Sequence, residues 1–84
     1  MTDKEFKTMR MRAITAVVMG ALDDAFAAFR ANPGGPGFGA LHDAMWAAQF
    51  IKQSSHEDWI MNKVLDLPIG SWLEVIANQA KGQM

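Results

Sequence analysis

An apolar stripe of helical period between residues 6 and 29 restricts the fold of this 84-residue chain more than any other feature. Its members recur at steps of three and four, which places their side chains on one face of an α-helix. Thr2 and Glu5 have the spacing of a capping box, which predicts that the helix begins beside them. Gly20 interrupts the stripe and costs a helix about 1 kcal/mol relative to alanine, so both one continuous helix and a bend or break near Gly20 fit the pattern. The stripe consists of Phe6, Met9, Ala13, Ile14, Val17, Val18, Ala21, Leu22, Ala25, Phe26 and Phe29.

The segment NPGGPGFG, residues 32–39, is expected to be a loop. Glycine and proline make up most of it, and each proline biases the residue before it away from the helical region. A phosphate-binding loop would need a strand before it and a Lys-Ser/Thr pair after it, and the sequence has neither. We therefore expect a connection between two helices, with Phe38 tucked against them.

Three shorter helical segments follow the loop. Residues 41–53 place apolar side chains on one face at helical spacing. Ser54 and Ser55 precede Glu57 and Asp58 at capping-box spacing, and the helix that they start is expected to stop before Pro68. Ser71 repeats this pattern with Glu74 at the start of the last helix. No segment shows the alternation of a strand, so the predicted fold is all-α: a single domain over residues 1–84, built as a small bundle of four to five helices.

Net charge and cysteine content exclude several classes of function. The formal net charge is −1, whereas a protein that binds nucleic acid by neutralising phosphates carries a basic excess. Without cysteine, the chain has no disulfide, no Cys-based zinc site and no thiol nucleophile. The longest apolar run, residues 16–22, is too short to span a membrane. We expect a cytoplasmic protein, encoded by a bacterium, phage or plasmid, without membrane association or direct sequence-specific binding to nucleic acid.

The titratable residues give little support for catalysis. The histidine–carboxylate clusters are His42-Asp43 and His56-Glu57-Asp58. Adjacent residues of a helix point about 100° apart, so neither cluster can chelate a metal alone. The expectation is a protein without catalytic residues, metal or cofactor. The alternative is a metal-dependent enzyme in which His42, Asp43 and His56 meet across helices.

Four side chains outside the main apolar faces are candidates for partner binding. Trp46 and Phe50 lie one turn apart, well away from the main apolar face of their helix. They fit either a central helix that is covered on both sides or a pair of anchors for a partner protein. Asp23 and Asp24 fit either a solvated face or a contact with a basic partner.

Three segments of the chain resemble the Hha/YmoA family of small enterobacterial gene-expression modulators. Residues 61–72, MNKVLDLPIGSW, match a family segment with Met-Asn-Lys, two apolar or aromatic residues, Asp, Pro, serines and Trp. Phe6 followed by Met-Arg-Met-Arg at residues 9–12 matches an aromatic residue followed by Met-Arg-Leu-Arg. Residues 41–48 share with the family an Ala-Ala pair placed after a leucine. With gaps, the likeness covers about residues 3 to 76.

The resemblance implies an all-helical, non-enzymatic protein. Family members dock on the N-terminal dimerisation domain of H-NS-type nucleoid proteins and strengthen the silencing of target genes. The docking is largely electrostatic, so Asp23, Asp24 and Gln49 are the expected polar contacts. Gln49 stands where the family has a partner-binding aspartate. The family turns a basic surface toward DNA. In this chain that surface is reduced to Lys4, Lys7, Arg10 and Arg12.

A second class of function fits the same chain. A phage- or plasmid-encoded inhibitor, such as an anti-CRISPR or other anti-defence protein, is small, neutral or acidic, and acts by masking a surface. Trp46 and Phe50 would then be its anchors. Self-association also stays open, because apolar residues make up 50% of a domain too small to bury them all.

Overall fold

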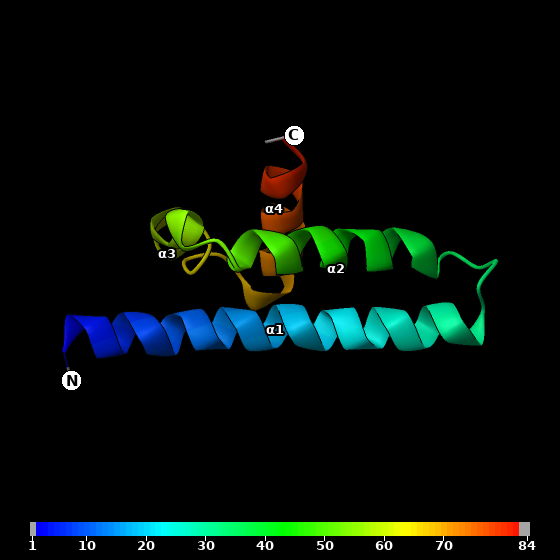
Figure 1. Cartoon of the computed structure of the whole chain (residues 1–84), viewed down its shortest axis with the longest axis horizontal. Helices are drawn as coiled ribbons and strands as arrows, with labels where there is room; N and C mark the ends of the chain where they lie inside the picture. The colour runs from blue at the N-terminus through cyan, green and yellow to red at the C-terminus, as the bar shows by residue number, and fades with distance from the viewer. Residues whose placement is uncertain (1, 83–84) are drawn as a thin grey trace.

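The computed structural model describes residues 2–82, with the side chain of Ser54 outside the described set. These residues form four α-helices and one short 3-10 helix, and no strand occurs among them (Figure 1). The elements are α1 (Asp3–Ala31), α2 (Gly37–Ile51), η1 (Ser54–His56), α3 (Glu57–Lys63) and α4 (Ile69–Gly82). The predicted all-α bundle is therefore confirmed. None of the described helices is long and apolar enough to cross a membrane.

Helix α1 is one continuous helix of 29 residues, so the predicted alternative of a break near Gly20 is wrong. The backbone N–H of Glu5 donates to Oγ1 of Thr2 at 3.2 Å, which confirms the predicted N-terminal cap. Gly20 lies on the exposed side of the helix, while Val18 and Ala25 on either side of it are buried. Packing of the turns before and after Gly20 keeps the helix intact at this position, because burial stabilises helical turns more than one glycine weakens them.

The loop between α1 and α2 is shorter than predicted, because α2 already begins at Gly37. Pro36 has helical backbone angles, φ −74° and ψ −2°, and occupies the N-cap position of α2. Proline suits a helix start, since the first turn has no intrahelical partners for its N–H groups. Phe38 is not tucked in: its ring is 60% exposed, although it lies 6.2 Å from the ring of Phe29.

The last two α-helices do not begin where the predicted caps placed them, and the predicted capping bond of the Ser54 side chain lies outside the described residues. Residues 54–56 form η1, and α3 begins after His56, whose side chain makes no capping hydrogen bond. Helix α3 ends at Lys63, and a turn separates it from Pro68. Helix α4 begins at Ile69, two residues before the predicted cap Ser71, whose backbone N–H donates to the Pro68 carbonyl at 2.9 Å. The fixed φ of Pro68 already prepares the chain for a helix, so no serine cap is needed.

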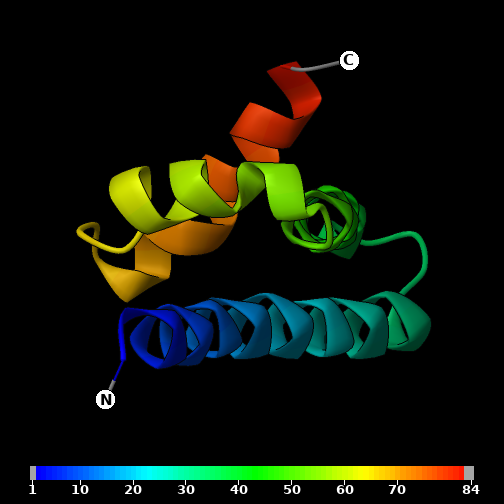
Figure 2. The same cartoon turned by 60° about the vertical axis from the view of Figure 1, so that its left-hand side comes forward.

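The core lies between α1 on one side and α2, α3 and α4 on the other (Figure 2). Trp72 is buried in it and donates its indole N–H to the Leu67 carbonyl at 3.0 Å, which ties α4 to the turn before it. The segment that resembles the Hha/YmoA family therefore contributes to packing. The largest fully buried side chains are Ile14, Val18, Ile60, Val64 and Ile76.

The apolar stripe of α1 is wider than the face that the other helices cover. Phe6, Met9 and Phe26 belong to the stripe, yet their side chains are 51%, 53% and 37% exposed. In both views α2, α3 and α4 lie on one side of α1, and no described residue covers the other side (Figures 1 and 2). This uncovered side runs along the whole helix.

Candidate functional site

The exposed side of α2 carries a row of aromatic and apolar side chains. We call this row the α2 outer face. Its residues lie on neighbouring turns of one side of the helix, beginning with Phe38 in the first turn, and four of them are exposed while Trp46 is half-buried. Between them lies a shallow depression of about 200 Å³, lined by His42, Met45, Trp46 and Gln49. The α2 outer face consists of Phe38, His42, Met45, Trp46 and Gln49.

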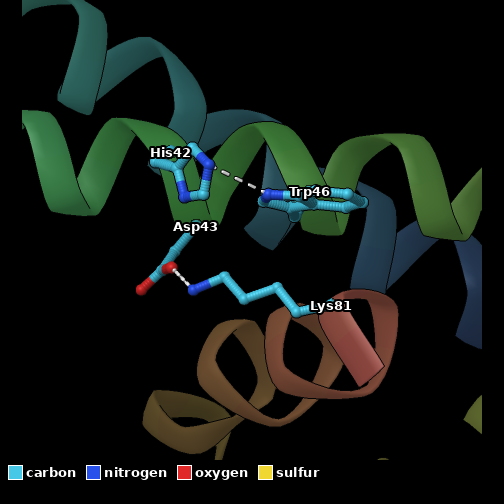
Figure 3. A network of polar contacts seen from close by, with 4 residues as sticks. All are labelled: His42, Asp43, Trp46 and Lys81. Carbon is cyan, nitrogen blue, oxygen red and sulfur yellow. Dashed lines mark hydrogen bonds and ion pairs between the residues drawn. The ribbon is translucent and has the colours of Figure 1, made fainter. Parts of the chain in front are cut away.

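Contacts within the α2 outer face hold its rings in place. Nε1 of Trp46 donates to Nε2 of His42 at 3.1 Å, and the two rings meet edge-on (Figure 3). The ring of Phe38 stacks on that of His42, with centroids 6.1 Å apart and an interplanar angle of 23°. The indole N–H can only donate, so Nε2 of His42 is the acceptor in this contact. The three rings form a ladder along one line of the helix.

An ion pair connects α4 to α2 beside the α2 outer face. Nζ of Lys81 on α4 reaches the carboxylate of Asp43, beside His42 and Trp46 (Figure 3). Both side chains are only partly exposed, at 38% and 39%. This contact joins the C-terminal turn of α4 to the middle of α2, so it steadies the helix that presents the aromatic ladder.

The structure separates Trp46 from Phe50, which the sequence paired as anchors. Trp46 is half-buried: it packs against the core and also lines the depression. Phe50 is only 3% exposed, its ring stacked 3.7 Å from that of His56 and 5.7 Å from that of Trp59. The interpretation of Phe50 as a partner anchor is therefore wrong, because η1 and α3 cover that side of α2.

The three polar candidates lie on two different helices. Gln49 is exposed and borders the depression on α2. Asp23 and Asp24 are exposed on α1, and Asp23 points about 180° around the helix axis from the buried Ile14. The acidic pair and Gln49 therefore do not form one continuous site. Sequence reasoning missed Phe38, His42 and Met45, although the i, i+4 spacing of Phe38, His42 and Trp46 was a usable signal.

The histidines and acids of the alternative enzyme hypothesis are not brought together. His42 contacts Trp46, Asp43 pairs with Lys81, and His56 stacks on Phe50, whose carbonyl lies 3.1 Å from Nδ1 of His56. Within residues 2–82, no three His, Asp or Glu side chains converge in a way that could hold a metal ion.

A second depression, of about 350 Å³, lies on the uncovered side of α1. It is lined by side chains from the N-terminal half of that helix, namely Lys4, Glu5, Thr8, Met9 and Arg12. It includes two of the basic residues that the family resemblance singles out, but acidic and apolar side chains lie between them. The surface is thus mixed in charge and partly apolar, and it resembles a protein-binding surface more than a uniformly basic one.

Comparison of the chain with models of protein families, with curated proteins and with solved structures finds no match.

Proposed function

We propose that this protein is a non-catalytic interaction module that docks a partner protein on the α2 outer face. The observation that carries the proposal is the ordered ladder of Phe38, His42 and Trp46 beside an exposed methionine. Phe38 is 60% and Met45 is 46% exposed. Large aromatic and methionine side chains dominate the buried centres of protein interfaces, and here they lie together on one helix.

The geometry of the ladder lowers the cost of binding. A side chain that is already held in one rotamer loses less conformational entropy when a partner covers it. The hydrogen bond from Trp46 to His42 and the stack of Phe38 on His42 supply this order before binding. Gln49 at the rim offers both donors and acceptors for the polar edge of an interface.

The resemblance to the Hha/YmoA family makes the dimerisation domain of an H-NS-type nucleoid protein the first proposed partner. In that case the protein modulates transcription through its partner, with Gln49 as a polar contact and Asp23 and Asp24 as acidic contacts. Exposure of all three residues is compatible with this role. Because Gln49 and the aspartates lie on different helices, such a partner would have to wrap around the edge of the bundle.

The apolar character of the α2 outer face favours a second candidate, an inhibitor that masks the surface of a host defence complex. A partner that docked by charge alone would need no aromatic ladder. An anti-defence protein that covers a surface does need such anchors, and Trp46 and Met45 are placed to act as them.

Calorimetric titration against a purified H-NS-type dimerisation domain tests the first partner. Binding is expected to be lost in Met45→Glu and retained in Ile69→Glu, a matched change at an apolar residue of α4 that is 62% exposed. Binding that survives Met45→Glu but is lost in an Asp23→Asn/Asp24→Asn variant would move the site to α1 and overturn the α2 proposal. No binding by the native chain would exclude the nucleoid protein, and the same variant pair would then be tested against defence complexes.

A further inference from the structure

The uncovered side of α1 carries a second pattern, which shares Met9 and Phe26 with the apolar stripe but none of its buried residues. Eight residues follow one another there at alternating steps of four and three, the heptad spacing of helices that pair along a seam. At 100° per residue they fall within an arc of about 100°, opposite the buried Ile14. We call this row the α1 seam; it consists of Glu5, Met9, Arg12, Ala16, Met19, Asp23, Phe26 and Arg30.

The side chains of the α1 seam are available to a partner. Met19 is half-buried and packs partly against the core, so it lies at the edge of the open side. The other seven residues are exposed, including two large apolar residues, Met9 and Phe26. The depression of about 350 Å³ lies over the N-terminal half of the seam. Figures 1 and 2 both show the opposite side of α1 occupied by the other helices and this side open.

The seam is complementary to itself when a second copy runs in the opposite direction. In an antiparallel pair related by a two-fold axis, two residues face each other when their numbers add up to a constant. With a constant of 35, Glu5 faces Arg30 and Arg12 faces Asp23. In the same register Met9 faces Phe26, and Ala16 faces Met19 at the centre. Every charged residue of the seam thus meets an opposite charge, and every apolar residue meets an apolar one.

We propose that the α1 seam is the interface of an antiparallel homodimer, formed with a second copy of this chain. Charge complementarity identifies the occupant: the two-fold pairing forms four opposite-charge contacts across the interface, because each pair occurs twice. A parallel pairing in register would instead place Glu5, Arg12, Asp23 and Arg30 each against its own copy. Like charges at such close distance disfavour that arrangement, so the seam selects antiparallel partners.

The apolar layers are suited to close packing. Sulfur–aromatic contacts such as that between Met9 and Phe26 are favourable, and methionine adapts to irregular gaps. Ala16 at the centre lets the two helices approach. Arg30 already lies over the Phe26 ring, with its guanidinium carbon 5.9 Å from the ring centroid. The charged contact of Arg30 and the apolar contact of Phe26 are therefore adjacent in the interface.

The dimensions of the seam predict a dimer of modest affinity. Residues 5–30 span about 38 Å of helix, and a strip about 10 Å wide gives each copy a contact footprint of roughly 400 Å². Stable complexes bury about 800 Å² per partner. We therefore expect dimerisation at micromolar rather than nanomolar concentrations, with weaker association at high salt, because the contacts near both ends are ionic. This interface shares no residue with the α2 outer face, so the dimer does not depend on docking there. It does include Asp23, so an acidic contact of Asp23 with a nucleoid protein and the dimer exclude each other.

Charge reversal across the seam tests the dimer by sedimentation equilibrium. Arg12→Asp and Asp23→Arg each place like charges opposite each other twice per dimer, so each variant alone is expected to dimerise at least about tenfold more weakly than the native chain. An equimolar mixture of the two variants restores both opposite-charge contacts and is expected to regain the native dimer. Asp24→Arg makes the same charge change one residue along, outside the seam, and is expected to leave dimerisation unchanged. Circular dichroism is the folding control: each variant is expected to keep its helices, because the substituted residues are exposed.

Cysteine pairs check the register, because the native chain has no cysteine of its own. A mixture of Met9→Cys and Phe26→Cys chains is expected to form a disulfide-linked heterodimer under mild oxidation, faster than either variant alone. The proposal is overturned if the native chain is monomeric up to about 500 µM, which lies well above the dissociation constant of a micromolar dimer. It is also overturned if the mixed charge variants stay monomeric, or if Asp24→Arg weakens the dimer as much as Asp23→Arg.

Discussion

Trp46 donates its indole N–H to Nε2 of His42, one helical turn earlier on α2, at 3.1 Å. Because the indole N–H can only donate, Nε2 of His42 is the acceptor of this bond. It fixes the indole at the rim of the depression on the α2 outer face. Trp46 is therefore oriented by a neighbour on its own helix before any partner arrives.

Replacement of His42 by phenylalanine tests this orientation. The variant keeps an aromatic ring for Phe38 and Trp46 to contact, but it removes the hydrogen-bond acceptor. We expect the free energy of unfolding to fall by about 1 kcal/mol or less, because the bond is exposed to water. The indole N–H resonance of Trp46 should shift upfield in an NMR spectrum. An unchanged resonance would mean that the bond is not formed in solution.

Gly20→Ala is expected to stabilise the protein. Gly20 lies within α1, and a Cβ added there would meet no atom within 4 Å. Alanine is favoured over glycine inside a helix by about 1 kcal/mol, so urea denaturation should show a gain of roughly that size. Gly35→Ala is the control: a Cβ at that position would lie 2.3 Å from Nδ2 of Asn32, so no such gain is expected. Equal gains from both variants would contradict the argument that alanine stabilises the chain at position 20 because the site is helical and has room for a Cβ.

Phe50→Ala is expected to destabilise the fold by about 3–5 kcal/mol, the usual cost of removing a buried aromatic ring. Phe50 is 3% exposed and stacks on His56, so its loss leaves a cavity between α2 and α3. Met45→Ala, on the exposed side of the same helix, should change the free energy of unfolding by about 0.5 kcal/mol or less. Chemical denaturation of the two variants distinguishes core from surface, and similar losses would contradict the assignment of Phe50 to the core.

The ion pair between Lys7 on α1 and Asp58 on α3 predicts a dependence of stability on pH. Nζ of Lys7 lies 2.8 Å from Oδ1 of Asp58. The hydrogen bond and then the charge of Lys7 lower the pKa of Asp58 below its ordinary value of 3.8, and Asp58 likewise raises the pKa of Lys7 above 10.5. Because the pKa of Asp58 is lowered in the fold, the ionised carboxylate stabilises the fold at pH values above its ordinary pKa. This contribution is lost as pH falls through the folded pKa. The raised Lys7 pKa stabilises the fold below 10.5, and that contribution is lost at higher pH.

Thermal unfolding between pH 2 and pH 7 measures the acid side of this effect. Asp58→Asn should reduce the gain in melting temperature between acid and neutral pH, and 1 M salt should reduce it in the native chain, because both groups are exposed. Asp66→Asn, at an exposed carboxylate in the turn after α3, is the matched control. An equal effect of the two substitutions would contradict a specific contribution of the ion pair.

Periodicity predicted the helices and most of the core, because the spacing of apolar residues indicates which face of a helix is buried. The errors occur where a local signal met a tertiary constraint. Gly20 suggested a break, but packing of Val18 and Ala25 kept α1 continuous. Ser71 suggested a cap, but Pro68 started α4 two residues earlier.

The candidate site was harder to predict than the helices. Trp46 and Phe50 have the same local sequence signal. Only the path of η1 and α3 decides that Phe50 is buried while Trp46 is half-buried and also lines the depression. That path depends on contacts between residues far apart in the chain, which no local pattern reports. Phe38 was expected to be covered for the same reason, since the position of the loop end on the surface is a property of the assembled bundle.

The bundle leaves two separate surfaces open, one on α1 and one on α2, and this determines its valency. A single copy offers one α2 outer face and can bind and cover only one partner surface. Two copies joined through α1 present two such faces on one rigid body, so they can link two partner molecules or grip two sites on one assembly. Linked binding sites raise the effective concentration of the second contact, and modest affinities then add up to firm attachment. Dimerisation through the uncovered side of α1 would thus convert a protein that covers one partner into one that links two.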